Sequence, residues 1–191
     1  RLTFSHLSLD LDGLQHLTQL ESLSLEHCTL KRLDALASLP LRALSLEGST
    51  AAPTPLPSTL RSLNLRAFDA EIPGLDRLSL HTLCGSESII LGYARAAELA
   101  EVEVDQCWYP ARLAGLPVRR LTYGGAYTPE HAALLKGPFP LAPFVALPGL
   151  QVLRIIPPLP THLLEDVAAF RAHPSLSVFV VDHEWSKHVF A

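Results

Sequence analysis

Residues 20–30 read LESLSLEHCTL, and this stretch decides the fold. Its leucines follow the pattern apolar-x-x-apolar-x-apolar. Leu23 and Leu25 are two positions apart, as residues on one face of a β-strand are, while Ser22 and Ser24 belong to the other face. The stretch therefore predicts a short strand with one apolar face and one polar face.

The same pattern recurs along the chain. Nine copies can be aligned, and they begin at Phe4, Leu20, Leu41, Leu60, Leu75, Leu99, Val118, Leu150 and Leu176. In this alignment the strand residues of the first copy are Leu7 and Leu9, and those of the fifth are Leu78 and Leu80. The steps between starts are uneven: the shortest leads from Leu60 to Leu75 and the longest from Val118 to Leu150. Since one unit cannot bury its apolar face alone, the repetition predicts stacked units that share a continuous core.

The unit resembles the leucine-rich repeat, whose consensus is L-x-x-L-x-L-x-x-N/C-x-L. Residues 20–30 fill every consensus position, and residues 99–109 repeat the pattern with Cys107 in the N/C position. The other copies hold different residues there, so we expect the family's asparagine ladder to be absent. The resemblance covers nearly the whole chain and implies an α/β leucine-rich-repeat solenoid. Such a solenoid would be curved, with about nine repeats, a parallel sheet on its concave face and extended or short helical segments on its convex face.

Residues 56–65 read LPSTLRSLNL and resemble the short bacterial variety of the repeat, in which a Leu-Pro pair precedes the strand. The chain has one asparagine and three lysines in 191 residues, beside many alanines, leucines, arginines and prolines. This bias fits GC-rich coding, and together the two features indicate a bacterial protein.

We expect one leucine-rich-repeat domain over residues 1–191, with a Pro-rich insertion near 129–149 and a C-terminal cap near 176–191. The early connector at residues 52–57 is Pro-rich and should run extended. Helices are predicted over residues 92–100, 128–137 and 161–173.

Composition excludes several classes of protein. Hydrophobic residues make up 48% of the chain and charged residues 18%, so there is enough apolar surface to form a core. A net charge of -4 disfavours nucleic acid as a partner. The apolar runs are shorter than the roughly 20 residues needed to cross a bilayer, so we expect no membrane partner.

Cysteine usage and the start of the chain bear on its compartment. Three cysteines, Cys28, Cys84 and Cys107, make an odd number outside any short secreted scaffold, which favours reduced thiols. The chain opens at Arg1 without a charged and then apolar leader, so we expect a mature or excised chain. Of the compartments, the cytoplasm is favoured.

The best candidate for a catalytic or metal site is residues 182–188, which read DHEWSKH. A zinc-protease helix needs two histidines four residues apart, whereas His183 and His188 are five apart. Gly124-Gly125 lacks the context of a phosphate-binding loop. We therefore expect no catalytic residue, no metal and no cofactor. The alternative is a substrate-recognition domain of a larger enzyme or effector whose catalytic domain lies outside this chain.

The residues between and after the strand leucines should line the concave face, where partners of this family usually dock. Ser24 and Ser45 present small hydroxyls, and Asp10, Glu26 and Glu47 form an acidic column. Neighbouring parallel strands are roughly 4.8 Å apart, so these carboxylates would repel one another unless a cation lay against them. We therefore expect a protein partner with a basic segment; the alternative is a solvated polar face. The candidate partner-binding residues are Asp10, Ser24, Glu26, Ser45, Glu47, Arg66, His81 and Trp108.

Aromatic and apolar residues give two further alternatives. Trp108 could anchor a partner, whereas Tyr123 is expected to fill a core leucine position. Val152, Ile156 and Val178 could form an apolar patch, or a C-terminal cap could cover them. The sequence thus predicts a monomeric protein–protein interaction module that recognises a partner protein on its concave face.

Overall fold

The computed structural model describes residues 1–68, 70–93, 99–105, 110–124, 142–156, 170, 173–183 and 186–190. The chain divides into two compact units, unit 1 (Arg1–Leu99) and unit 2 (Ala100–Ala191). Among the residues just given, no helix has the length and apolar content needed to span a membrane.

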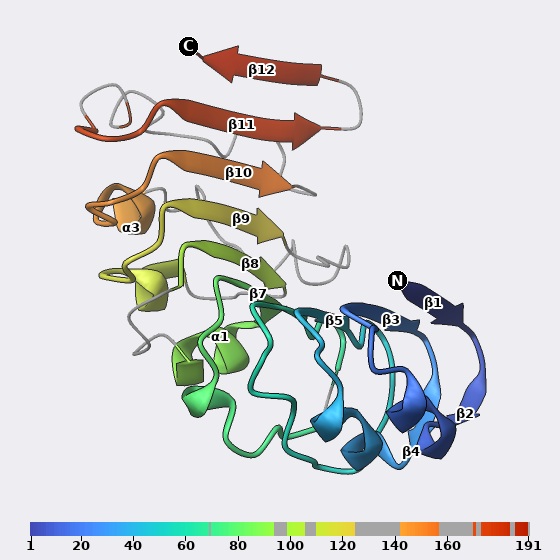
Figure 1. Ribbon diagram of the computed structural model, residues 1–191. Coiled ribbons are helices and arrows are strands. Elements are labelled where there is room, and N and C mark those ends of the chain that lie inside the picture. Colours follow the sequence, from blue (N-terminus) through green and yellow to red (C-terminus); the bar gives the residue numbers. More distant parts are fainter. Residues whose placement is uncertain are drawn as a thin grey trace. The chain divides into compact units, whose positions relative to one another are not determined.

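Unit 1 contains a parallel sheet in which each strand pairs with the next one along the sheet (Figure 1). In order, the strands are β1 (Leu2–Ser5), β3 (Ser22–Glu26), β5 (Ala43–Ser45), β6 (Ser62–Asn64) and β7 (Thr82–Ser86). A second, two-stranded parallel ladder joins β2 (Ser8–Asp10) to β4 (Thr29–Lys31), and a bridge from Thr29 to Thr50 extends it.

The leucines of successive strands lie in register and form the core of unit 1. Leu23, Leu44, Leu63 and Leu83 are aligned across four strands, and each is at most 3% exposed. Their neighbours in each strand point the other way and are mostly half-buried, as the alternation of a strand requires. Burying each leucine contributes about 1.5–3 kcal/mol. The predicted strand-per-repeat architecture is confirmed.

The first repeat has a different register from the one predicted. Leu2 aligns with Leu23 and Phe4 aligns with Leu25, so the expected strand residue Leu7 lies beyond the strand and is 47% exposed. A turn fixes this register, because His6 adopts a left-handed backbone conformation with φ 56°. Leu9 belongs to β2 in the second ladder instead.

The fifth repeat is also shifted. Leu83 aligns with Leu63, so the repeat begins at Leu80, and Leu75 starts the 3₁₀ helix η3 (Leu75–Arg77) rather than a repeat. The predicted spacings were too short before Leu75 and too long after it, because the wrong register had been assigned. The connector is rich in leucine and therefore matches the repeat pattern as well. With this correction the spacing is nearly even over the starts at Leu20, Leu41, Leu60, Leu80, Leu99 and Val118.

The connectors of unit 1 are short helical turns or extended chain. The turns are η1 (Asp12–His16), η2 (Leu33–Ser38) and η3, and residues 51–57 carry no helix or strand. The α-helix α1 (Glu87–Tyr93) begins earlier than the predicted helix at 92–100, of which residues 94–98 lie outside the described chain. It is fixed by Ile90 and Tyr93, which are buried three residues apart on one face.

A two-residue ladder replaces the asparagine ladder of the consensus. The Ser49 hydroxyl is 1% exposed, donates to the Leu25 carbonyl at 2.8 Å and accepts the Cys28 amide at 2.9 Å. The Cys28 thiol reaches the carbonyls of Glu26 at 3.3 Å and Phe4 at 3.7 Å. Serine and cysteine therefore satisfy turn backbone groups between repeats.

Unit 2 holds a second run of strands. β8 (Glu101–Asp105), β9 (Arg120–Gly124), β10 (Val152–Ile156) and β11 (Val178–His183) are parallel, and β12 (Ser186–Phe190) runs antiparallel beside β11. Their registers confirm the predicted copies at Leu99, Val118, Leu150 and Leu176. Between the strands lie η4 (Pro110–Leu113) and α3 (Ala142–Val145).

The core of unit 2 includes aromatic residues. Tyr123 is 1% exposed in a leucine position, as predicted, and its ring packs edge-on against Phe144 at 5.3 Å between centroids. The buried His173 ring meets the Leu147 carbonyl at 3.1 Å. The predicted helix at 128–137 lies outside the described residues, as does that at 161–173 except for residues 170 and 173.

Candidate functional site

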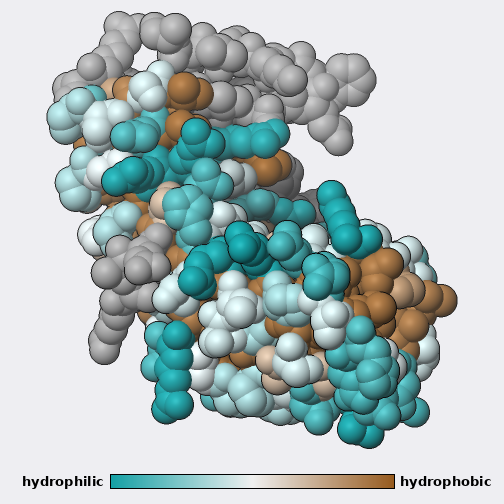
Figure 2. Space-filling view, viewed as in Figure 1, coloured by the Kyte–Doolittle hydropathy of each residue, from teal (hydrophilic) through white to brown (hydrophobic). Residues whose placement is uncertain are grey.

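The candidate site is the outward face of the unit 1 sheet. We define the polar face as the side chains of Ser24, Glu26, Ser45, Glu47, Asn64 and Arg66. All six side chains are half-buried, and each residue follows a buried leucine on a strand or just after it. In the space-filling view, unit 1 is covered by polar and pale side chains, apart from an apolar patch by the N-terminal strands (Figure 2).

Left-handed turns position the charged column of this face. The residue after each charged position is His27, Gly48 or Ala67, with φ of 52°, 61° and 51°. The His27 amide donates to the Glu47 carbonyl at 2.8 Å, and the Gly48 amide donates to the Arg66 carbonyl at 2.8 Å. These bonds align the backbones of the three charged residues across neighbouring repeats.

Hydrogen bonds connect the side chains of the polar face. The Ser24 hydroxyl donates to Glu26 Oε1 at 2.9 Å. Asn64 Nδ2 donates both to the Ser45 hydroxyl and to Glu47 Oε2, each at 3.1 Å. Asn64 Oδ1 accepts the amide of Arg66 at 3.0 Å. The amide side chain of Asn64 therefore links two adjacent repeats.

An internal cation relieves the repulsion expected among the carboxylates. Arg66 Nη1 lies 3.6 Å from Glu47 Oε1, with the two side chains 38% and 31% exposed. Glu26 has no ion pair with any side chain in the described part of the chain and is bonded to Ser24. Of the two carboxylates on this face, the one without an internal cation among the described side chains is Glu26.

Two predicted site residues lie away from the polar face. Asp10 is on β2, aligned with Lys31, and its Oδ1 accepts the amide of Asp12 at the start of η1, at 3.1 Å. This position follows from the corrected register of the first repeat, in which Ser5 aligns with Glu26. His81 is exposed just before β7, and its amide donates to the Arg61 carbonyl at 2.7 Å. Trp108 lies outside the described residues.

Sequence reasoning did not select Asn64 as a candidate binding residue and did not identify a pair of histidines. The rings of His6 and His27 stack with centroids 5.1 Å apart and planes 9° apart. Two features of the sequence could have pointed to them. Asn64 is the chain's one asparagine, and each histidine directly follows the last residue of its strand, β1 or β3. The wrong register of the first repeat concealed the histidine pair.

Across the part of the chain that the structure describes, no three histidine, cysteine, aspartate or glutamate side chains gather in a way that could hold a metal ion. Cys28 and Cys84 are buried and form no disulfide. Cys107 lies outside the described residues.

Comparison with known proteins bears on the fold. No family model matches the sequence, and no curated protein matches it. The structure is similar to the crystal structure of internalin C2, a leucine-rich-repeat protein from Listeria monocytogenes, with a TM-score of 0.53 and 18% sequence identity. The match covers 94% of this chain and 80% of the internalin chain. Together with the repeat registers, this likeness shows that the chain has the leucine-rich-repeat fold.

Proposed function

We propose that this chain is a protein-binding module and that the polar face of unit 1 is its docking surface. The observation that carries the proposal is the hydrogen-bonded set of side chains from Ser24 to Arg66 on an outward-facing sheet. Side chains that are already held in place lose less conformational entropy when a partner binds, which favours affinity. A leucine-rich-repeat scaffold supports such a role in general, since the residues on its surface can vary from one protein to another while the core residues stay the same.

The charges of the face refine the chemistry of the partner. Glu47 is already paired with Arg66 and bonded to Asn64, so it offers less to a partner's cation than the sequence indicated. Glu26 is held by a neutral hydroxyl alone among the described side chains. We therefore expect a basic residue of the partner to lie against Glu26, with Ser24 and Ser45 supplying neutral contacts beside it.

A crosslinking experiment tests this docking surface. Ala43 is a small, half-buried residue on the same side of the sheet as the polar face. A photo-reactive phenylalanine analogue at this position should therefore crosslink to a protein that is bound over the polar face. The captured protein is identified and produced in pure form, and its affinity is then measured for the wild type and for the Glu26→Lys, Glu47→Lys variant. We expect the variant to lose binding, because it reverses the charge at Glu26 and places a lysine against Arg66.

A matched variant distinguishes the effect of the polar face on binding from the effect of net charge. Glu21→Lys, Asp34→Lys makes the same change in charge at two exposed residues outside the polar face. We expect this variant to keep its affinity to within a few-fold. Equal binding by the wild type and the face variant would contradict the proposal.

A further inference from the structure

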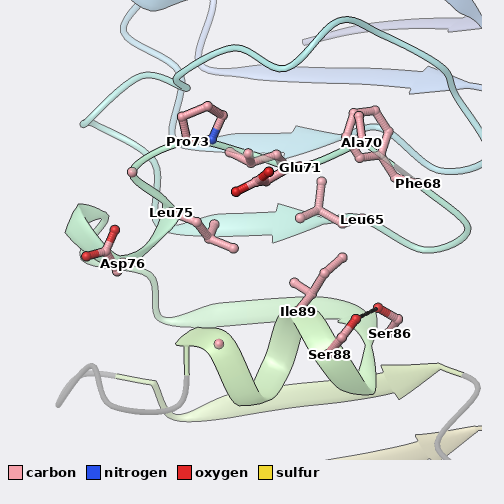
Figure 3. Close-up of a pocket in the computed structure, with 13 residues that line it drawn as sticks. Leu65, Phe68, Ala70, Glu71, Pro73, Leu75, Asp76, Ser86, Ser88 and Ile89 are labelled. Atoms are coloured by element: carbon pink, nitrogen blue, oxygen red, sulfur yellow. Dashed lines mark hydrogen bonds between the residues drawn. The ribbon is translucent and has the colours of Figure 1, made fainter.

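A cavity of about 720 Å³ lies in unit 1 between the connector after β6 and the helix α1 (Figure 3). Its volume is within the range of about 300–1,000 Å³ that is usual for ligand sites. It is lined by core and connector residues and by the first and last turns of α1, and none of the polar face residues takes part. The cavity is therefore separate from the proposed docking surface.

The cavity lies where the kind of connector changes along the chain. The connector of the fifth repeat contains the α-helix α1, whereas the first and second repeats have 3₁₀ turns. Gly92 lines the cavity from the helix, and a Cβ atom at this position would meet nothing within 4 Å. The absence of a side chain here leaves open space beside the connector.

The walls of the cavity are apolar and its rim is acidic. Leu65 and Ile72 are buried at 1% and 9% exposure, and the side chain of Ile89 also points into the space. Glu71 and Asp76 carry carboxylates on the connector side. The carboxylate of Glu71 lies above the side chain of Leu75, whereas that of Asp76 lies at the outer end of the connector and points away from Leu65 and Ile89 (Figure 3).

The two carboxylates of the rim differ from those of the polar face. Neither Glu71 nor Asp76 has an ion pair or a side-chain hydrogen bond to any residue that the structure describes, whereas Glu26 and Glu47 are both bonded. No lysine, arginine or histidine is among the described residues that line the cavity. Opposite the rim, the hydroxyls of Ser86 and Ser88 hydrogen-bond to each other at 3.0 Å, which leaves acceptor capacity on both oxygens.

We propose that this cavity binds a basic side chain presented by a partner protein. Arginine and lysine combine a cationic head with an aliphatic stem. The apolar walls match the stem, and the carboxylate of Glu71 matches the cation, while the negative charge of Asp76 adds to the attraction from the outer end of the connector. This second site rests on the proposed protein-binding role, but it uses other elements than the polar face and does not depend on that docking surface.

The test uses a minimal probe on the full chain. Backbone amide NMR spectra are recorded while Nα-acetyl-arginine amide is added, and the titration is repeated with Nα-acetyl-citrulline amide, which has the same length without the charge. We expect saturable shifts of the amides of residues 70–76 and 86–92 with the arginine probe and much weaker binding of the citrulline probe. Glu71→Gln should raise the dissociation constant about two- to fivefold, and Asp76→Asn should raise it by less.

Two glycine variants complete the design. Gly92→Leu should fill the cavity and weaken binding of the arginine probe at least as much as either carboxylate variant. Gly13→Leu is the matched control, since a Cβ at Gly13 also meets nothing within 4 Å and the residue lies in η1. Equal binding of the citrulline probe, shifts that map outside the two segments, or an arginine titration that does not saturate would each overturn the proposal. The face variant Glu26→Lys, Glu47→Lys should bind the probe normally, so failure of one proposal leaves the other standing.

Discussion

The two units build the same kind of core with different degrees of regularity. In unit 1 the repeats starting at Leu20, Leu41 and Leu60 follow one another at nearly even spacing, whereas in unit 2 the last two steps, from Val118 to Leu150 and on to Leu176, are longer and unequal. Leucine dominates the core of unit 1, whereas unit 2 also accommodates valine, isoleucine and Tyr123 in the equivalent positions. The comparison shows that the fold requires apolar residues at a fixed spacing within the strand and tolerates change elsewhere.

The outward faces of the two sheets differ more than their cores. In unit 1, small hydroxyls and one asparagine join charged residues into a bonded set. In unit 2, the same positions hold Glu103, Thr122 and Arg154, and an ion pair joins Glu101 to Arg120 at 3.3 Å. Because the outward positions do not constrain the core, they are free to differ in chemistry, and partner recognition is expected to follow the face.

The largest expected effect tests whether both cores are equally essential. Leu44→Ala in unit 1 and Leu153→Ala in unit 2 each remove a side chain that is at most 3% exposed. Each should lower the free energy of unfolding by about 2–5 kcal/mol, through lost burial and the cavity left behind. Amide hydrogen exchange in β3 and β5 reports on unit 1, and exchange in β9 and β10 reports on unit 2. A loss below about 1 kcal/mol in either unit would contradict the assigned core.

The next effect concerns the serine and cysteine ladder of unit 1. Ser49→Ala leaves the buried Cys28 amide without its acceptor, so the free energy of unfolding should fall by about 1–3 kcal/mol. Ser58→Ala, at an exposed position in the same unit, is the control and should change stability by less than about 0.5 kcal/mol. Chemical denaturation of the two variants measures the difference. Equal stabilities would show that the ladder does not contribute.

A smaller effect is expected from the ion pairs on the two faces. A double-mutant cycle with Glu47→Gln and Arg66→Met should give a coupling free energy of about 0.2–1 kcal/mol, which decreases as salt is added. The same cycle on Glu101 and Arg120 in unit 2 should give less, because Arg120 is 63% exposed against 38% for Arg66. A larger coupling in unit 2 would mean that exposure does not control these pairs.

The smallest effect tests the corrected register of the first repeat. Leu7→Ser should change the free energy of unfolding by less than about 0.5 kcal/mol, because the Leu7 side chain is 47% exposed. Leu23→Ser, at a fully buried strand position, provides the contrast and should be strongly destabilising. A large loss of stability from Leu7→Ser would support the register that the sequence predicted.

Sequence reasoning recovered most of the fold, and its two register errors have one physical cause. The spacing of strand leucines is unambiguous where the connectors are polar or Pro-rich, as around Leu23 and Leu44. In the first and fifth repeats the connector also carries leucines at the same spacing, so Leu7 and Leu78 matched the pattern equally well. The pairings of Leu2 with Leu23 and of Leu83 with Leu63 in the structure distinguish the registers.

The candidate site was recovered in part. The alternation of residues in each strand correctly put Ser24, Glu26 and Ser45 on the outward side of the sheet. The partners of these side chains could not be read from the sequence, because the contact between Asn64 and Glu47 joins residues of neighbouring repeats. The carboxylates at the cavity rim could not be identified from the sequence either, because only the structure shows the cavity that they line.

The central claim is that a partner protein docks on the outward face of unit 1 and not on that of unit 2. Hydrogen exchange tests it most directly, measured on the wild-type chain alone and in its non-covalent complex with the purified partner that crosslinking identified. We expect slower exchange in peptides covering residues 22–27, 43–48 and 62–67, and unchanged exchange in peptides covering residues 101–104, 120–124 and 152–156. Protection of the unit 2 strands with no change in unit 1 would contradict it.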